Sequence, residues 1–141
     1  MKRIKRKELI LLLLITILLT GCGQKLKCKI DGHVEGRKYT STIVVKFSEG
    51  KPSTYSFEDK MMFATLDPNA ELYYHSKYEE YGTLIAEKYA RISNNADNIS
   101  LKIKYDFNKN NSSQENKILI GRNDTRDAAK GKLENIGYKC K

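Results

Sequence analysis

Apolar and polar positions alternate along four stretches of the chain, which is the pattern of β-strands that bury one face. The stretches cover residues 26–30, 39–47, 55–63 and 99–107, and lysines fill many of the polar positions. Turn sequences with Gly32, Gly36 and Gly50 separate the first three stretches. We therefore predict a β-meander and a later fourth strand. Asp59 interrupts the apolar face of the third strand, which predicts a bulge or a strand end there.

Between the third and fourth stretches, apolar residues recur every three or four positions. Asp67 and Pro68 are typical of a helix start, because Asp caps free backbone N–H groups and Pro suits the first turn. The residues that would form the buried side of this helix are Tyr74, Tyr78, Tyr81, Leu84, Ile85, Tyr89 and Ile92. The pattern predicts one long amphipathic helix from residue 67 to about residue 94.

A polar loop over residues 108–116 and a short apolar run over 118–120 lead to a second predicted helix. Asp124 is its candidate cap, Ala129, Leu133 and Ile136 form its apolar side, and Gly137 ends it. Together the elements predict an α+β fold. We expect an antiparallel β-meander sheet of about four strands, covered by one long and one short helix.

The first 22 residues have a different pattern. A basic start is followed by an apolar run from Leu9 to Leu19. About a dozen apolar residues are too few for a transmembrane helix, which needs roughly 20. Basic, apolar and small-residue regions in this order are typical of a secretory signal peptide.

The signal ends in Leu19, Thr20, Gly21 and Cys22, which resemble the lipobox of bacterial lipoproteins. The resemblance implies that Cys22 receives a diacylglyceryl group and, in the three-chain form, an N-acyl chain. It also implies that residues 1–21 are removed. Two or three acyl chains form a durable membrane anchor, whereas one chain binds only marginally. We therefore predict a lipidated Cys and short tether over 22–25 and one extracytoplasmic domain over 26–141, held at the cell membrane.

The formal charge of the chain is +9, and the signal contributes five cations and one anion to it. The mature part is therefore only mildly basic. Outside the cell, the candidate acidic partners are anionic lipid headgroups and wall polymers, and an envelope protein is a further candidate. The predicted location excludes nucleic acid as a partner.

Cys28 and Cys140 lie near the two ends of the mature chain. An oxidising location and the absence of zinc-type Cys spacing favour a disulfide between them. Two separate thiols are the alternative. A catalytic Cys is disfavoured, because neither His33 nor His75 lies in a recognisable nucleophile motif.

Two groups of residues have the spacing of metal ligands. Glu71, His75 and Glu79 share one side of the predicted helix, but a single His among acids is more typical of a solvated surface. Asp106, Asn108, Asn110 and Ser112 resemble part of a calcium loop, but Asn111 stands where Gly is expected and Lys117 where a bidentate Glu is expected. We predict no metal and no cofactor.

Two surfaces are candidates for binding. The helix tyrosines could stack on wall sugars if they were exposed, but their spacing favours core packing. The lysines of the first and fourth strands could form a basic sheet face toward anionic lipid, although lysines are also ordinary solubilising residues. These lysines are Lys25, Lys27, Lys29, Lys102 and Lys104.

The lipobox, the order of the predicted elements and the tail Gly137-Tyr138-Lys139-Cys140 resemble the YehR-like small bacterial lipoproteins. This resemblance implies an α+β fold, no established activity and no catalytic residues to transfer. We predict a non-catalytic binding or accessory module at the cell surface. Two alternatives remain: an envelope hydrolase around His75 and Glu79, and a structural protein that lies on anionic lipid through a basic sheet face.

Overall fold

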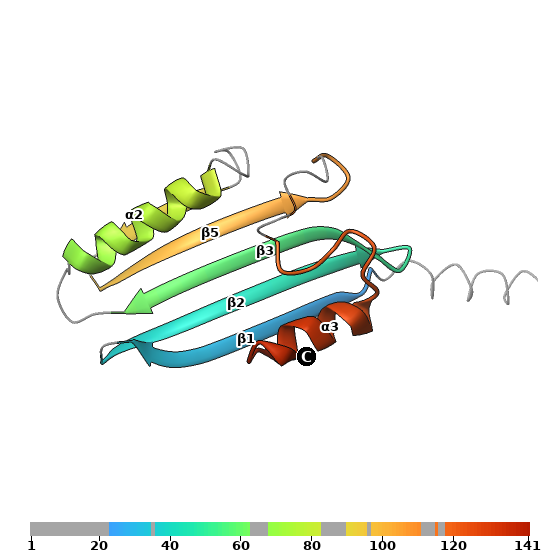
Figure 1. Ribbon diagram of the computed structural model, residues 1–141, viewed down its shortest axis with the longest axis horizontal. Helices are drawn as coiled ribbons and strands as arrows, with labels where there is room; N and C mark the ends of the chain where they lie inside the picture. Colours follow the sequence, from blue (N-terminus) through green and yellow to red (C-terminus); the bar gives the residue numbers. More distant parts are fainter. Residues whose placement is uncertain are drawn as a thin grey trace, which may run out of the picture.

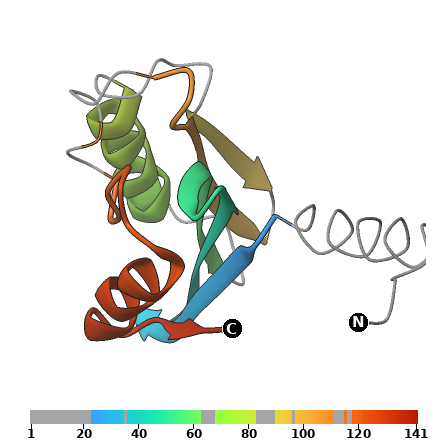
Figure 2. The ribbon, with the colours of Figure 1, turned by 90° about the vertical axis from the view of Figure 1, so that its right-hand side faces the viewer.

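The computed structural model describes residues 23–34, 36–62, 68–82, 90–95, 97–110, 115 and 118–141. Its centre is an antiparallel sheet of six strands in the order β4-β5-β3-β2-β1-β6, and the sixth strand has only two residues. Both described helices pack against the same face of this sheet (Figures 1 and 2). The predicted α+β class and antiparallel sheet are confirmed.

The first three strands form the predicted meander. They are β1 (Lys25–Val34), β2 (Arg37–Ser48) and β3 (Lys51–Met62). Glu49 and Gly50, both with positive φ (53° and 77°), form the two-residue turn between β2 and β3. Two consecutive positive φ angles match the right-handed twist of the strands they connect, which explains the Gly in this turn.

Asp59 does not cause the predicted irregularity in β3. It pairs regularly with Ser41 on β2 and with Leu101 on β5 (Asn98–Asp106). The register shift lies instead between Lys46 and Phe47, at the other end of the β2–β3 ladder. A polar residue on the apolar face is accommodated here by buried polar neighbours, so the backbone needs no bulge.

The long helix predicted over 67–94 is wrong in its second half. Helix α2 covers Pro68–Gly82, and residues Ala90–Asn95 form β4, which pairs with β5. Ala90 lies opposite Ile103, and Ile92 lies opposite Leu101. Pairing with β5 supplies backbone hydrogen bonds to an otherwise open sheet edge, and β-branched residues favour strands. The free energy gained from this pairing exceeds the local preference for a helix that the apolar spacing indicated.

Helix α3 (Arg126–Asn135) begins one residue later than predicted, because its cap is Thr125. The Thr125 hydroxyl accepts a hydrogen bond from the Ala128 backbone N–H (3.2 Å). The predicted cap, Asp124, instead accepts from the Gly121 N–H (2.7 Å) and pairs with Lys132 (2.8 Å). Gly137 follows the helix with φ of 98°, as expected for a helix-ending glycine.

The chain then returns to the sheet as β6 (Lys139–Cys140), beside β1. β4 and β6 account for the difference between the six strands observed and the roughly four predicted. Two residues are too few to show an alternating pattern, so the sequence carries no signal for β6.

The core lies between the helices and the sheet face that they cover. Helix α3 contributes Ala129 and Leu133, and α2 contributes Tyr74, each with no exposed surface. The sheet contributes alternate residues of its long strands: Leu26, Cys28, Ile43, Val45, Phe47, Tyr55, Met61, Ile99, Leu101, Ile103 and Tyr105. We call this side of the sheet the covered face and the opposite side the open face.

Candidate functional site

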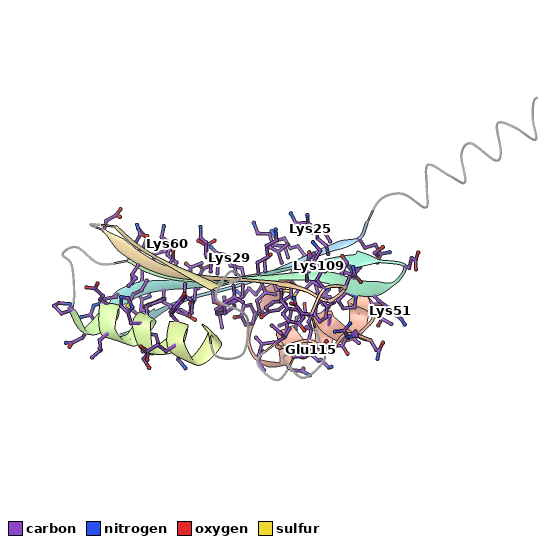
Figure 3. All side chains as sticks on the ribbon, turned by 90° about the horizontal axis from the view of Figure 1, so that it is seen from above. Lys25, Lys29, Lys51, Lys60, Lys109 and Glu115 are labelled. Atoms are coloured by element: carbon purple, nitrogen blue, oxygen red, sulfur yellow. A yellow bond between two sulfur atoms is a disulfide. The ribbon has the colours of Figure 1, made fainter. Side chains whose placement is uncertain are left out.

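The open face is rich in lysine because the polar positions of each alternating strand project from it. None of the described helices packs on this face, as Figure 3 shows. Lys25, Lys29 and Lys60 point away from the helices in that view. The strand registers and the backbone pairing of residue 141 with Lys27 assign ten lysines to the open face: Lys25, Lys27, Lys29, Lys38, Lys46, Lys60, Lys102, Lys104, Lys139 and Lys141.

The strand registers place three carboxylates on the open face, and each already pairs with a lysine. Asp31 pairs with Lys29 (2.8 Å), Glu58 with Lys102 (3.2 Å) and Asp106 with Lys109 (3.8 Å). The hydrogen bonds of Asp31 with the Lys29 and Thr40 side chains lower its pKa. With ten lysines against three carboxylates, the open face carries a large excess of positive charge.

Six of these lysines form a continuous group along β1 and its two neighbours. We call this group the basic strip: Lys25, Lys27, Lys29, Lys46, Lys139 and Lys141. Three of its cross-strand pairs place lysine opposite lysine, namely Lys25 with Lys46, Lys27 with Lys141 and Lys29 with Lys139. Like charges directly opposite each other destabilise a sheet. The fold therefore gains nothing from these pairs.

Protection of an exposed sheet edge is the usual structural role of strand lysines. That role explains Lys139 and Lys141, which lie on the edge strand β6 and just after it. It does not explain Lys27 and Lys29, because β1 is paired on both sides at these two residues, whereas Lys25 is paired only with Lys46 of β2. Edge protection therefore leaves part of the basic strip unexplained.

The disulfide assembles the basic strip from the two ends of the mature chain. Cys28 and Cys140 are bonded through their sulfur atoms (1.98 Å) and lie directly opposite each other on β1 and β6. Both point to the covered face, so their neighbours Lys27, Lys29 and Lys139 point to the open face. The predicted pair is thus present, and it holds Lys139 beside the lysines of β1.

The predicted lipid-attachment residues Leu19, Thr20, Gly21 and Cys22 lie outside the described residues. The chain is nevertheless held by the domain from Gln24 onward, because the Gln24 carbonyl accepts from the Phe47 N–H (2.8 Å). A Cβ on Gly23 would lie 3.3 Å from the Phe47 carbonyl oxygen, so the backbone is close to β2 there as well. The folded domain therefore includes Gln24 and Lys25, which were predicted to belong to the tether.

An open depression of about 540 Å³ lies at this end of the domain. Its lining residues are Gln24, Lys25, Gly50, Thr125, Arg126 and Asp127. Arg126 and Asp127 bring opposite charges to the same wall, so charge alone selects no class of ligand for it.

The covered face contains a buried polar cluster that the sequence patterns did not predict. Asp59 is 9% exposed, and burial raises its pKa to about 6, although a hydrogen bond from the Tyr39 hydroxyl opposes this shift. Burial, with the nearby Asp59 charge, also raises the pKa of Tyr39 and that of Tyr74. Within the described part of the chain, Asp59 Oδ1 and the Tyr74 hydroxyl have no hydrogen-bond partner.

This cluster is closed to solvent by α2, whose Tyr74 is fully buried above it. Nearby, the Ser41 and Tyr138 hydroxyls share a hydrogen bond (2.6 Å) and link the cluster to the end of α3. A single enclosed carboxylate has no access to a substrate. Its foreseeable effect is on stability, since a buried charge with an unsatisfied oxygen is costly. The polar residue in an apolar pattern was the signal that could have located it.

The predicted metal ligands on α2 form only an exposed ion pair. His75 Nε2 lies 3.9 Å from Glu71 Oε1, and the side chains are 56% and 39% exposed. No cluster of three or more His, Cys, Asp or Glu residues with metal-binding geometry occurs among the described residues. The His75 and Glu79 pair of the hydrolase alternative is likewise on an exposed helix surface.

The calcium-like loop is arranged as a turn. The Asp106 carboxylate accepts from the Asn108 N–H (3.0 Å), and the Asn110 side chain donates to the Asp106 carbonyl (2.9 Å). Arg122 donates to the Phe107 and Asn110 carbonyls and pairs with Glu115. The Asp106 and Asn110 carbonyl oxygens and the Asp106 carboxylate therefore already accept hydrogen bonds. Asn111, Ser112 and Lys117 lie outside the described residues.

The tyrosines of α2 divide between core and surface. Tyr74 is buried and Tyr78 packs partly against the core, as the spacing predicts, whereas Tyr73 is 48% exposed. Leu72, beside it, is 71% exposed. Tyr89 lies outside the described residues.

Comparisons of the chain with family models, curated proteins and solved structures found no match. The resemblance to YehR-like lipoproteins therefore stays a prediction. None of the helices in the described ranges is long and apolar enough to cross a membrane.

Proposed function

We propose that this chain is a lipid-anchored extracytoplasmic module without catalytic activity, and that its open face binds phosphate-bearing anionic ligands. The observation that carries the proposal is the lysine excess on a sheet face that none of the described helices covers. Lysine ammonium groups are strongly hydrated point charges that suit phosphate groups without demanding one geometry. The resemblance to YehR-like lipoproteins agrees with this proposal, since it implies no catalytic residues.

The lipid anchor is tested by the Cys22→Ser variant in the producing bacterium. We expect the variant to fold, to form the Cys28–Cys140 bridge and to leave the membrane fraction for the medium. The Lys25→Glu/Lys27→Glu variant is the control, because it keeps Cys22 and should stay in the membrane fraction. Retention of Cys22→Ser protein on membranes after a high-salt wash would exclude the anchor.

The open face is tested by retention of the released Cys22→Ser protein on a phosphate-bearing cation-exchange matrix. We expect Lys25→Glu/Lys27→Glu to lower the salt concentration needed for elution. The matched control is Lys51→Glu/Lys130→Glu, which changes the net charge equally but lies at the β2–β3 turn and on α3. Equal effects of the two pairs would show that net charge alone decides binding, and the open face would lose its assigned role.

A further inference from the structure

The basic strip begins next to the predicted lipid attachment. Lys25 follows Cys22 by three residues, so the two Cα atoms lie within about 10 Å of each other. Lys29 is four strand residues further along β1, which adds about 14 Å. Because Gln24 is hydrogen-bonded to Phe47, the sheet cannot swing freely on a long linker.

Two orientations of the domain on the membrane differ in how many lysines meet the lipid. If the strands stand upright, Lys29 and Lys139 lie beyond the Debye length of about 8 Å at physiological salt. If the open face lies on the membrane, all six lysines of the basic strip are within that distance. Only in the second orientation are all six lysines of the basic strip attracted to the anionic headgroups.

Helix α2, on the other side of the sheet, has the opposite preference. It carries Glu71 and Glu79 against Lys77. Helix α3 adds no acidic excess, because its two carboxylates, Asp127 and Glu134, are balanced by Arg126, Lys130 and Lys132. An anionic surface repels the acidic excess of α2 while it attracts the basic strip. The charge distribution therefore favours contact through the open face over contact through α2.

From these observations, and resting on the proposed lipid anchor, we infer that the basic strip lies on the anionic headgroups of the same membrane that holds Cys22. The membrane is favoured over a wall polymer because the anchor already holds it within reach of the strip, at high effective concentration. The strip consists of lysines alone, so the contact is electrostatic and involves no insertion of aromatic side chains.

The test uses the lipidated protein in vesicles of phosphatidylcholine, with and without phosphatidylglycerol. An amine-reactive reagent acetylates exposed lysines, and mass spectrometry gives the rate for each lysine. We expect Lys29, Lys139 and Lys141 to react about fivefold or more slowly on the anionic vesicles, since attraction to an anionic surface contributes about that factor per lysine. High salt should abolish this protection. Lys130 on α3 is the internal control and should react equally on both.

The Lys25→Glu/Lys27→Glu variant should lose the protection at Lys29 while its circular dichroism stays that of the unaltered protein. Equal acetylation of Lys29, Lys139 and Lys141 on both vesicle types overturns the inference. If the phosphate matrix still retains the Cys22→Ser protein in that case, the proposed function stands and a wall polymer becomes the ligand. If it does not, the proposed function fails too. Equal protection of these lysines from acetylation on neutral vesicles would also overturn the inference, because the protection would then not depend on anionic lipid.

Discussion

The same strands form both faces of the sheet, but different physical requirements decide which residues each face carries. On the covered face, Ile43, Val45 and Leu101 are buried under the helices, and stability decides which residues fit. On the open face, the lysines of β1 and β2 are exposed, and lysines face lysines at some cost in stability. Covered-face substitutions should therefore change folding, whereas open-face substitutions should change binding.

The largest expected effect comes from the Cys28–Cys140 bridge, which lies on the covered face and holds Lys139 beside β1 on the open face. In the chain-entropy model, a loop with a sequence separation of 112 contributes about 4 to 5 kcal/mol to the free energy of unfolding. We expect Cys28→Ala/Cys140→Ala to lose about that amount in urea unfolding. Reduction of the unaltered protein is the control and should have a similar effect. A loss below about 1 kcal/mol would contradict this account.

A second prediction compares two adjacent valines on opposite faces. Val45 is fully buried on the covered face, and Val44 is half-buried on the open face. Val45→Ala should lower the free energy of unfolding by about 2 to 3 kcal/mol, because two buried methyl groups are lost and a cavity remains. Val44→Ala should cost less than about 1 kcal/mol. Equal losses in urea unfolding would mean that the open face is also covered in solution.

Asp59 makes the covered face sensitive to pH. Burial raises its folded-state pKa from 3.8 to about 6, so the folded protein holds the proton more tightly than the unfolded chain. The contribution of Asp59 to stability is therefore highest below the unfolded pKa and falls as pH rises toward 6, by about 3 kcal/mol in all. The titratable groups near Asp59 are Tyr39 on β2, Tyr74 and Lys77 on α2, and Tyr138 after α3.

The Asp59→Asn variant should lose this pH dependence and be more stable than the unaltered protein at neutral pH. Urea unfolding at several pH values from about 4 to about 8 measures both effects. Glu58→Gln is the matched control, because Glu58 is the adjacent carboxylate on the open face and pairs with Lys102. Persistence of the pH dependence in Asp59→Asn would assign it to another group.

The smallest expected effect on stability is that of the basic strip. Lys25→Glu/Lys27→Glu should leave the free energy of unfolding within about 0.5 kcal/mol of the unaltered value, because both side chains are exposed. Replacing two lysines that face lysines also removes repulsion. The same variant should lose most of its retention on a phosphate matrix. A large loss of stability would place these lysines in the fold and not in the binding surface.

Much of this organisation could be predicted from residue order. Alternation in β1, β2 and β5 correctly separated the lysine positions from the core positions, because side chains on a strand alternate between its faces. The Glu49-Gly50 turn and the glycine that ends α3 were also visible, since each meets a local backbone requirement. Alternation alone therefore assigns the strand lysines to the sheet face opposite the core.

The identity of β4, the pairing of β6 and the burial of Asp59 depend on the tertiary structure alone. Residues 90–95 have helical spacing but form β4, because pairing with β5 supplies hydrogen bonds that no local pattern reveals. Lys139 and Lys141 join the basic strip only because β6 pairs with β1, more than a hundred residues away in sequence. Asp59 is buried because Tyr39 and Tyr74 enclose it from two other elements. Local chemistry determines which face a side chain takes, and long-range pairing determines its neighbours there.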